Sequence, residues 1–251
     1  MISAIDGREK LRSDLWTTAR LVREAIRASG VQSYVDSLSN LTDAFRPSDR
    51  ALRCIDRRTA GGIRLAGSGI LVGLDKAKAF AEAARTDRVT YHEDCGAARM
   101  WAQAHGLGED KVTDCARDFA AQLAAALGVP CEEAPLAGPP GFHDETAIYY
   151  DGTGLADPSR ASGLPKGFVI TRPYFGADPS DALQEVRMAV DIAFGPHGFA
   201  ALFTPENPLL LIPIGDPRDE RFSLEALTQE LRSLLLPERV ALDGFTAPRW
   251  L

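Results

Sequence analysis

The chain has 251 residues, of which 45% are hydrophobic and 25% are charged, as in an ordinary globular protein. Its 28 basic and 35 acidic residues give a formal net charge of −7, and the basic residues form no long run. Because a nucleic-acid backbone is bound mostly through cationic side chains, we expect no nucleic-acid partner.

The first ten residues lack the apolar region of a secretory signal. Apolar stretches such as residues 209–214 are far shorter than the roughly 20 residues that cross a bilayer. We therefore expect a cytoplasmic protein with no membrane partner. Thiols stay reduced in that compartment, so the 4 cysteines are candidates for metal binding, catalysis or the core rather than for disulfides.

Two helical patterns precede the first strand-like segment. Apolar residues at helical spacing predict a helix from Arg8 to about Ser29, and a weaker pattern covers residues 32–43. These helices can pack on their own subunit or reach across to a partner. The chain then alternates between the two kinds of element, with strands expected at 51–55, 63–66 and 89–92 and helices at 75–85, 96–105 and 109–127.

Residues 130–141, rich in proline, alanine and glycine, are the best candidate boundary between an N-terminal part at 1–129 and a C-terminal part at 142–251. Beyond it we expect strands at 146–150, 168–171 and 209–214 and helices that begin near Asp178 and Leu224. The inner face of the first of these helices would consist of Leu183, Val186, Val190 and Phe194. The alternation predicts an α/β fold whose central, mostly parallel sheet is flanked by helices, with the C-terminal part continuing the same domain. No internal repeat is visible in the sequence.

Two short segments carry the residues with the most distinctive chemistry. Cys54 directly follows a predicted strand, and His92 and Cys95 lie between the next predicted strand and a helix. Ligands of open parallel sheets gather at the carboxyl ends of the strands, so these side chains can meet. Two thiolates and an imidazole suit Zn²⁺ and leave a fourth position open, and a helix N-terminus at Cys95 favours the thiolate. We therefore predict that Cys54, His92 and Cys95 bind Zn²⁺.

Asp56 and Arg58 stand two positions apart beyond the same strand, so both side chains can point to one side. A carboxylate next to a guanidinium stays ionised and is held by charge-assisted hydrogen bonds. Such a pair can accept a proton from metal-bound water. Asp56 can also occupy the fourth metal position and swing away to Arg58, or the two can form a purely structural ion pair.

The order C-x-D-x-R followed by H-x-x-C resembles the zinc and dyad signature of the β-class carbonic anhydrases. Residues 63–69 are similar to the R-N-A-G-N stretch of that family, and residues 91–97 to its G-H-T-D-C-G-A stretch. The resemblance implies a homodimer or larger homo-oligomer that reversibly hydrates CO2 to bicarbonate by a metal-bound hydroxide. It implies Cys54, His92 and Cys95 as zinc ligands and Asp56 and Arg58 as the catalytic dyad. Gly67 and Gly96 are candidates for lining the site, and Arg64 can line it or sit on a strand edge.

The resemblance covers about residues 50–105 and departs from the family in three ways. The step from Cys54 to His92 is shorter than usual, Leu65 and Ser68 replace the two asparagines, and the chain after Gly141 matches nothing in the standard family. The chain is thus similar to a divergent branch such as the algal limiting-CO2-inducible proteins. Four functions stay open: CO2 hydration, hydrolysis of carbonyl sulfide or carbon disulfide, a catalytically silent zinc protein that binds bicarbonate or a protein partner, and a redox or thiol-transfer enzyme. The C-terminal part can supply a dimer contact, a lid or a degenerate copy of the first part.

Overall fold

The computed structural model describes residues 4–46, 49–56, 58–59, 61–136, 145–195 and 203–250, and the side chains of these from residue 17 onward. Within these ranges no helix is both long enough and apolar enough to pass through a bilayer.

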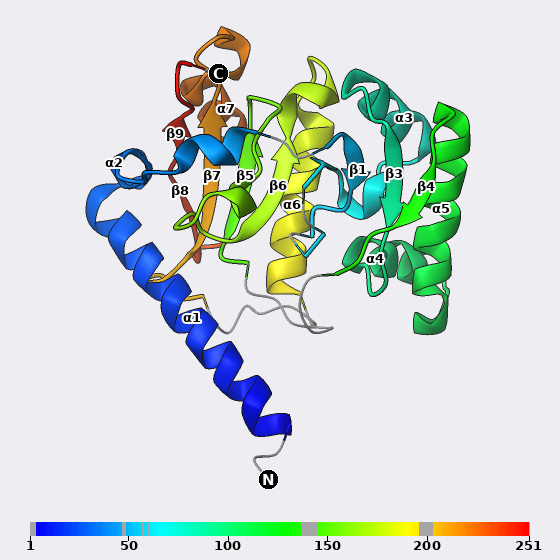
Figure 1. Ribbon diagram of the computed structural model, residues 1–251, viewed down its shortest axis with the longest axis horizontal. Helices are drawn as coiled ribbons and strands as arrows, with labels where there is room; N and C mark the ends of the chain where they lie inside the picture. Colours follow the sequence, from blue (N-terminus) through cyan, green and yellow to red (C-terminus); the bar gives the residue numbers. More distant parts are fainter. Residues whose placement is uncertain are drawn as a thin grey trace.

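The strands form two sheets in which all pairs are parallel. The first sheet, in the order β2-β1-β3-β4, consists of β1 (Ala51–Arg53), β2 (Ile63–Arg64), β3 (Arg88–Tyr91) and β4 (Cys131–Glu133). The second sheet, in the order β6-β5-β7-β8 with β9 also paired to β7, consists of β5 (Ala147–Asp151), β6 (Gly167–Thr171), β7 (Leu209–Gly215), β8 (Val240–Leu242) and β9 (Phe245–Thr246). The edge strands β2 and β6 lie next to each other (Figure 1).

Helices cover the faces of both sheets, which confirms the predicted α/β class with parallel strands, but the strands form two sheets rather than the one central sheet that we expected. They are α1 (Ala4–Ser29), α2 (Val31–Asp36), α3 (Leu74–Ala83), α4 (Gly96–Ala104), α5 (Val112–Leu127), α6 (Ser180–Phe194) and α7 (Leu224–Arg232). Short 3-10 segments lie at Leu41–Phe45, Ala66–Gly69, Glu109–Lys111, Pro158–Arg160, Arg172–Phe175 and Glu220–Phe222.

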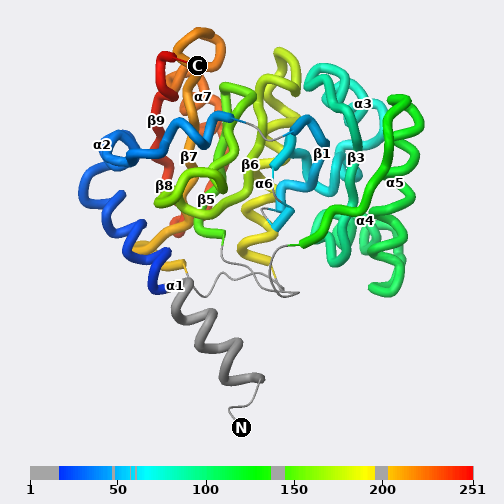
Figure 2. Tube along the Cα trace, in the orientation of Figure 1, coloured from blue at the N-terminus to red at the C-terminus, as the bar shows by residue number. Residues whose placement is uncertain are grey.

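The two sheets repeat one winding pattern that the sequence did not reveal. In each, the first strand lies inside the sheet, the second pairs on one side of it, and the third pairs on the other side and carries the fourth. Figure 2 shows β1 to β4 in one half of the molecule and β5 to β9 in the other. The C-terminal part therefore has the topology of a second copy, which was one of the three alternatives for it.

The N-terminal helices pack on the second sheet rather than on the first. Ile26, Val31 and Val35 share a buried cluster with Tyr149 and Ile212 of that sheet. The opposite face of the same sheet is covered by α6 and α7. Because both faces are covered, every residue of β5 and β7 is buried. The N-terminal helices thus pack against the C-terminal half of their own subunit.

Several predicted elements were wrong in extent. The helix expected at 32–43 ends at Asp36, where the Ser37 hydroxyl bonds to the Tyr34 carbonyl, and a 3-10 segment follows. The strand expected at 63–66 ends at Arg64, because the chain turns sharply in the Ala66–Gly69 segment. On α6, Leu183 and Phe194 are only partly buried, and the inner face consists mainly of alanine and valine. The strands β4, β8 and β9 are too short to give a sequence pattern.

The boundary region falls partly in the described chain. Cys131–Glu133 forms β4 of the first sheet, and β5 of the second sheet begins at Ala147. Residues 137–144 lie outside the described residues, so the position of the boundary stays a prediction.

Candidate metal centre

The three predicted ligands meet at the carboxyl ends of β1 and β3. The Sγ atoms of Cys54 and Cys95 are 3.9 Å apart, and one ligand atom from each of Cys54, His92 and Cys95 lies within 4.8 Å of the others. All three residues are buried. The parallel register of β1 and β3 explains why the ligands meet. Leu52 pairs with Val89, and both strands end a few residues later at the same edge of the sheet. The cluster could hold a metal ion.

One nitrogen of His92 is left for a ligand. Its Nδ1 lies 2.7 Å from the Glu93 carbonyl oxygen, an arrangement in which Nδ1–H donates. Its Nε2 is buried and has no hydrogen-bond partner among the described residues. Buried polar atoms are nearly always paired, and metal-binding histidines typically fix one ring nitrogen in this way. The unpartnered Nε2 therefore fits a metal ligand.

The sulfurs of Cys54 and Cys95 form a hydrogen bond with each other. Their mutual hydrogen bond, together with burial, raises the pKa of Cys54 well above its usual range. The same hydrogen bond lowers the pKa of Cys95, whose sulfur also faces the N–H groups of Ala97 and Ala98 at the start of α4. Burial alone would lower the pKa of His92, but the Cys54 sulfur and the charge of Asp56 raise it to about 9. A metal ion that binds here therefore displaces protons.

The Ala66–Gly69 turn holds the Cys54 sulfur by a hydrogen bond. The Gly67 N–H donates to Cys54 Sγ at 3.2 Å. Gly67 has φ 53°, and a methyl group added there would lie 2.7 Å from Ile70 Cγ2 and 3.5 Å from Cys95 Sγ. Only glycine fits this close approach without strain. Gly96, the first residue of α4, has more space, since an added methyl group would be 3.9 Å from Ile192 Cδ1.

Asp56 and Arg58 form a buried ion pair next to the ligands. The Arg58 side chain donates to both Asp56 oxygens at 2.6–3.1 Å, and its backbone N–H donates to Oδ1 at 2.9 Å. Burial works to raise the pKa of Asp56, but the hydrogen bonds and charge of Arg58 outweigh burial and lower it. The structure therefore has an ionised Asp56 held by Arg58, the arrangement expected when Asp56 is not a metal ligand.

Arg64 lies behind the ligand loop rather than in its cavity. Its Nη1 donates to the carbonyl oxygens of Cys54 and Asp56, at 2.8 and 2.9 Å, and to Thr59 Oγ1 at 2.7 Å. The side chain is buried and borders a separate cavity on the Asp157 side. Arg64 thus fixes the backbone that carries Cys54 and Asp56, and it does not line the metal-side cavity.

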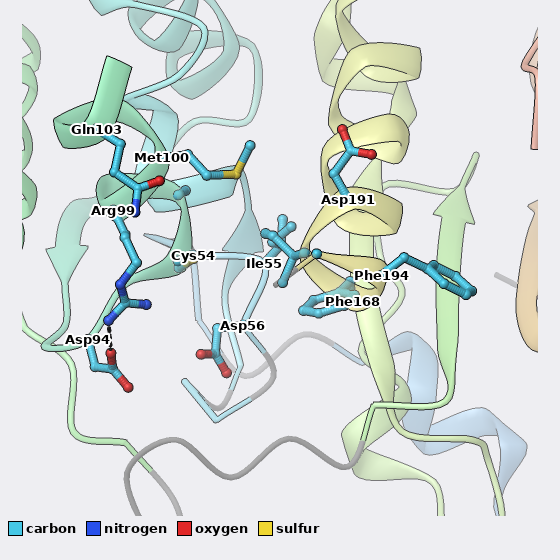
Figure 3. A pocket seen from close by; sticks show the side chains of 14 residues that line it. Cys54, Ile55, Asp56, Asp94, Arg99, Met100, Gln103, Phe168, Asp191 and Phe194 are labelled. Carbon is cyan, nitrogen blue, oxygen red and sulfur yellow. Dashed lines mark hydrogen bonds and ion pairs between the residues drawn. The ribbon is translucent and has the colours of Figure 1, made fainter. Parts of the chain in front are cut away.

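A cavity of about 440 Å³ opens between α4 and α6 and reaches Cys54 and Asp56 (Figure 3). Its remaining lining residues come from the first loop, from α4 and from the second half of the chain: Ile55, Asp94, Gly96, Ala97, Arg99, Met100, Gln103, Phe168, Asp191, Ile192, Phe194 and Gly195. Arg99 pairs with Asp94 at the rim and with Glu109 at 2.8 Å. The helical spacing of Gly96, Met100 and Gln103 could have indicated the α4 wall. Nothing in the sequence indicated that α6 forms the opposite wall.

Comparison of the chain with protein-family models, curated proteins and solved structures finds no significant match in any of the three. The function of the cluster is therefore argued from its own geometry.

A pair of glycine substitutions tests the role of the turn. Gly67→Ala should lower the free energy of unfolding by about 1–3 kcal/mol, because alanine at positive φ is strained and its methyl group meets Ile70. It should also weaken binding of Zn²⁺ or Co²⁺, because the N–H that supports Cys54 Sγ shifts. Gly96→Ala is the matched control and should change neither quantity. Chemical denaturation and metal titration measure both, and equal effects of the two variants would contradict this account.

Proposed function

We propose that the chain is a zinc-dependent enzyme that reversibly hydrates CO2 to bicarbonate, in the manner of a divergent β-class carbonic anhydrase. The observation that carries the proposal is the buried cluster of two sulfurs and an unpartnered imidazole nitrogen, beside a cavity that Cys54 and Asp56 line. Two thiolates and one imidazole are a common ligand set of catalytic zinc, which keeps its fourth position for water or substrate.

The donor set fits zinc better than the harder divalent cations. Thiolate and imidazole ligands select zinc and related metals, whereas magnesium and calcium require oxygen ligands. Cys54, His92 and Cys95 would hold the ion. When bound, zinc would supply a Lewis acid that lowers the pKa of a water molecule to roughly 7.

The protein groups around the cluster would orient a water molecule and accept its proton. Asp56 lines the cavity, and Arg58 lowers its pKa, so the carboxylate can accept a hydrogen bond or proton from a water molecule near the ligands. Arg58 fixes the carboxylate through the hydrogen bonds described above. Phe168 and Ile192 line the cavity and would give an uncharged, apolar gas a favourable surface.

The size and apolarity of the cavity favour a second candidate. Ile55, Met100, Phe168, Ile192 and Phe194 make most of the wall apolar, and about 440 Å³ is within the range of sites for small organic molecules. Carbon disulfide and carbonyl sulfide are larger and less polar than CO2, and the same groups would hydrolyse them. A zinc protein without turnover that binds bicarbonate or a protein partner is a third candidate.

We also propose a homodimer, because the resemblance implies one, and a cytoplasmic location, as expected from the sequence. The cavity itself needs no second subunit, since α4 and α6 of one chain form its two walls.

Asp56→Asn tests the proposed reaction. Asparagine preserves the shape of the side chain and loses the charge that accepts a proton, so exchange of ¹⁸O between CO2 and water should fall by about 100-fold or more while zinc content stays at the wild-type value.

Asp216→Asn is a matched control. Asp216 follows β7 of the second sheet, and its carboxylate accepts a similar set of hydrogen bonds from Arg218, at 2.8–2.9 Å, but no metal cluster accompanies it among the described residues. The CO2 exchange activity of the Asp216→Asn variant should equal that of the wild type. Zinc-loaded wild-type protein with no CO2 exchange would exclude the enzyme and leave the silent binding protein.

The second candidate predicts that the zinc-loaded protein releases hydrogen sulfide from carbon disulfide. Each carbon disulfide consumes two water molecules and yields two molecules of hydrogen sulfide and one of CO2. The larger side chain of the Ile192→Trp variant should narrow the cavity. It should therefore slow hydrolysis of carbon disulfide more than CO2 exchange. Absence of hydrogen sulfide from the wild-type protein alongside rapid CO2 exchange would exclude this candidate.

A further inference from the structure

A buried glutamate from the second half of the chain reaches the turn beneath the ligands. Glu185 lies on α6 and is only 1% exposed. Its Oε2 accepts the backbone N–H of Ala66 at 2.8 Å. Its Oε1 is buried and has no hydrogen-bond partner among the described residues. This is a long-range contact between the two repeated halves.

This contact lies next to the hydrogen bond that the Gly67 N–H donates to Cys54 Sγ. Ala66 and Gly67 present consecutive N–H groups, and these divide between two acceptors: Ala66 donates to Glu185 and Gly67 donates to Cys54 Sγ at 3.2 Å. The turn is further fixed by the Ser68 hydroxyl, which donates to the Thr90 carbonyl. Releasing the Ala66 N–H would free the turn to rotate and would misdirect the Gly67 N–H.

A carboxyl group is an expensive choice at this position. Its helix neighbours Ala182, Val186 and Ala189 are apolar and fully buried, and burial raises the pKa of Glu185 to about 7. An apolar side chain of similar length would fill the same space without the cost of burying a carboxyl group. What only an acceptor provides here is the hydrogen bond to Ala66.

We infer that Glu185 is a positioning residue of the metal centre: by holding the Ala66 N–H, it orients the adjacent Gly67 N–H toward Cys54 Sγ. The inference rests on the proposed metal function of Cys54, His92 and Cys95. It gives the second half of the chain a task at the ligands in addition to the cavity wall. Groups that orient first-sphere ligands commonly change metal affinity by about 10–100-fold when they are removed.

The test compares two substitutions in the full chain. Glu185→Met keeps the length and volume of the side chain and removes the acceptor, whereas Glu185→Gln keeps an amide oxygen that can accept from Ala66. Met188→Leu, a buried position on the same helix, is the control for disturbance of the core. Metal-free protein is titrated with Zn²⁺ against a chromophoric chelator, and the thiolate-to-metal absorption band is recorded with Co²⁺.

We expect Zn²⁺ affinity to fall by about tenfold or more in Glu185→Met, with a shifted Co²⁺ band. Glu185→Gln should restore both toward the wild type, and Met188→Leu should leave both unchanged. If Glu185 only joins the two halves, Glu185→Met would lower the melting temperature and leave affinity and band as in the wild type, which would overturn the inference.

Two further outcomes have defined meanings. If Glu185→Met fails to fold, Glu185→Asp replaces it, since the shorter side chain withdraws the carboxylate from Ala66, and the same loss of affinity is expected. Wild-type affinity in that variant would overturn the inference. A wild-type protein that binds neither Zn²⁺ nor Co²⁺ would end the proposed function, and this inference with it, whereas normal binding in the variants would end only the inference.

Discussion

The candidate centre depends on the parallel pairing of β1 with β3. Leu52 pairs with Val89, so the segments after β1 and β3 leave the sheet side by side. Cys54 and His92 therefore lie at the same edge. The third ligand, Cys95, follows at the N-terminus of α4, where backbone N–H groups stabilise its thiolate. The two thiols form a hydrogen bond with each other, but His92 Nε2 is buried without a partner among the described residues, which is costly. A metal ion would satisfy this nitrogen and bind both sulfurs at once.

The two halves of the chain share one winding pattern and differ in what stands at the strand ends. In the second sheet, Asp151 ends β5, and its buried carboxylate accepts hydrogen bonds from the backbone of Thr153 and Ala156. That strand end is satisfied by protein groups alone, whereas the end of β1 carries Cys54. The second half instead contributes α6, which supplies Ile192 to the cavity and Glu185 to the turn behind the ligands. One centre is thus assembled from both copies.

The sequence was sufficient for the local features and not for the long-range ones. The spacing of Cys54, His92 and Cys95, with strands before each segment, predicted their meeting because parallel strands end at one edge. Periodicity located most helices to within a few residues. The packing of α1 and α2 on the far sheet and the contacts of α6 could not be predicted, because they depend on how two halves without visible sequence similarity dock.

The role of Arg64 shows a similar limit. A strand arginine near a metal can face the cavity or the backbone, and the sequence does not distinguish these directions. The structure has it donating to the carbonyl oxygens of the ligand loop. The strand at residues 63–66 was likewise predicted too long, since the positive φ of Gly67 and Ser68 ends it early and no pattern of hydrophobic residues reports such a turn.

X-ray absorption at the zinc edge tests the central claim most directly, because it reports the atoms around the ion without reference to activity. The account predicts about one zinc ion per chain, bound by two sulfur atoms and one imidazole nitrogen with a further light atom. Protein that retains no zinc, or zinc surrounded only by nitrogen and oxygen, would contradict it.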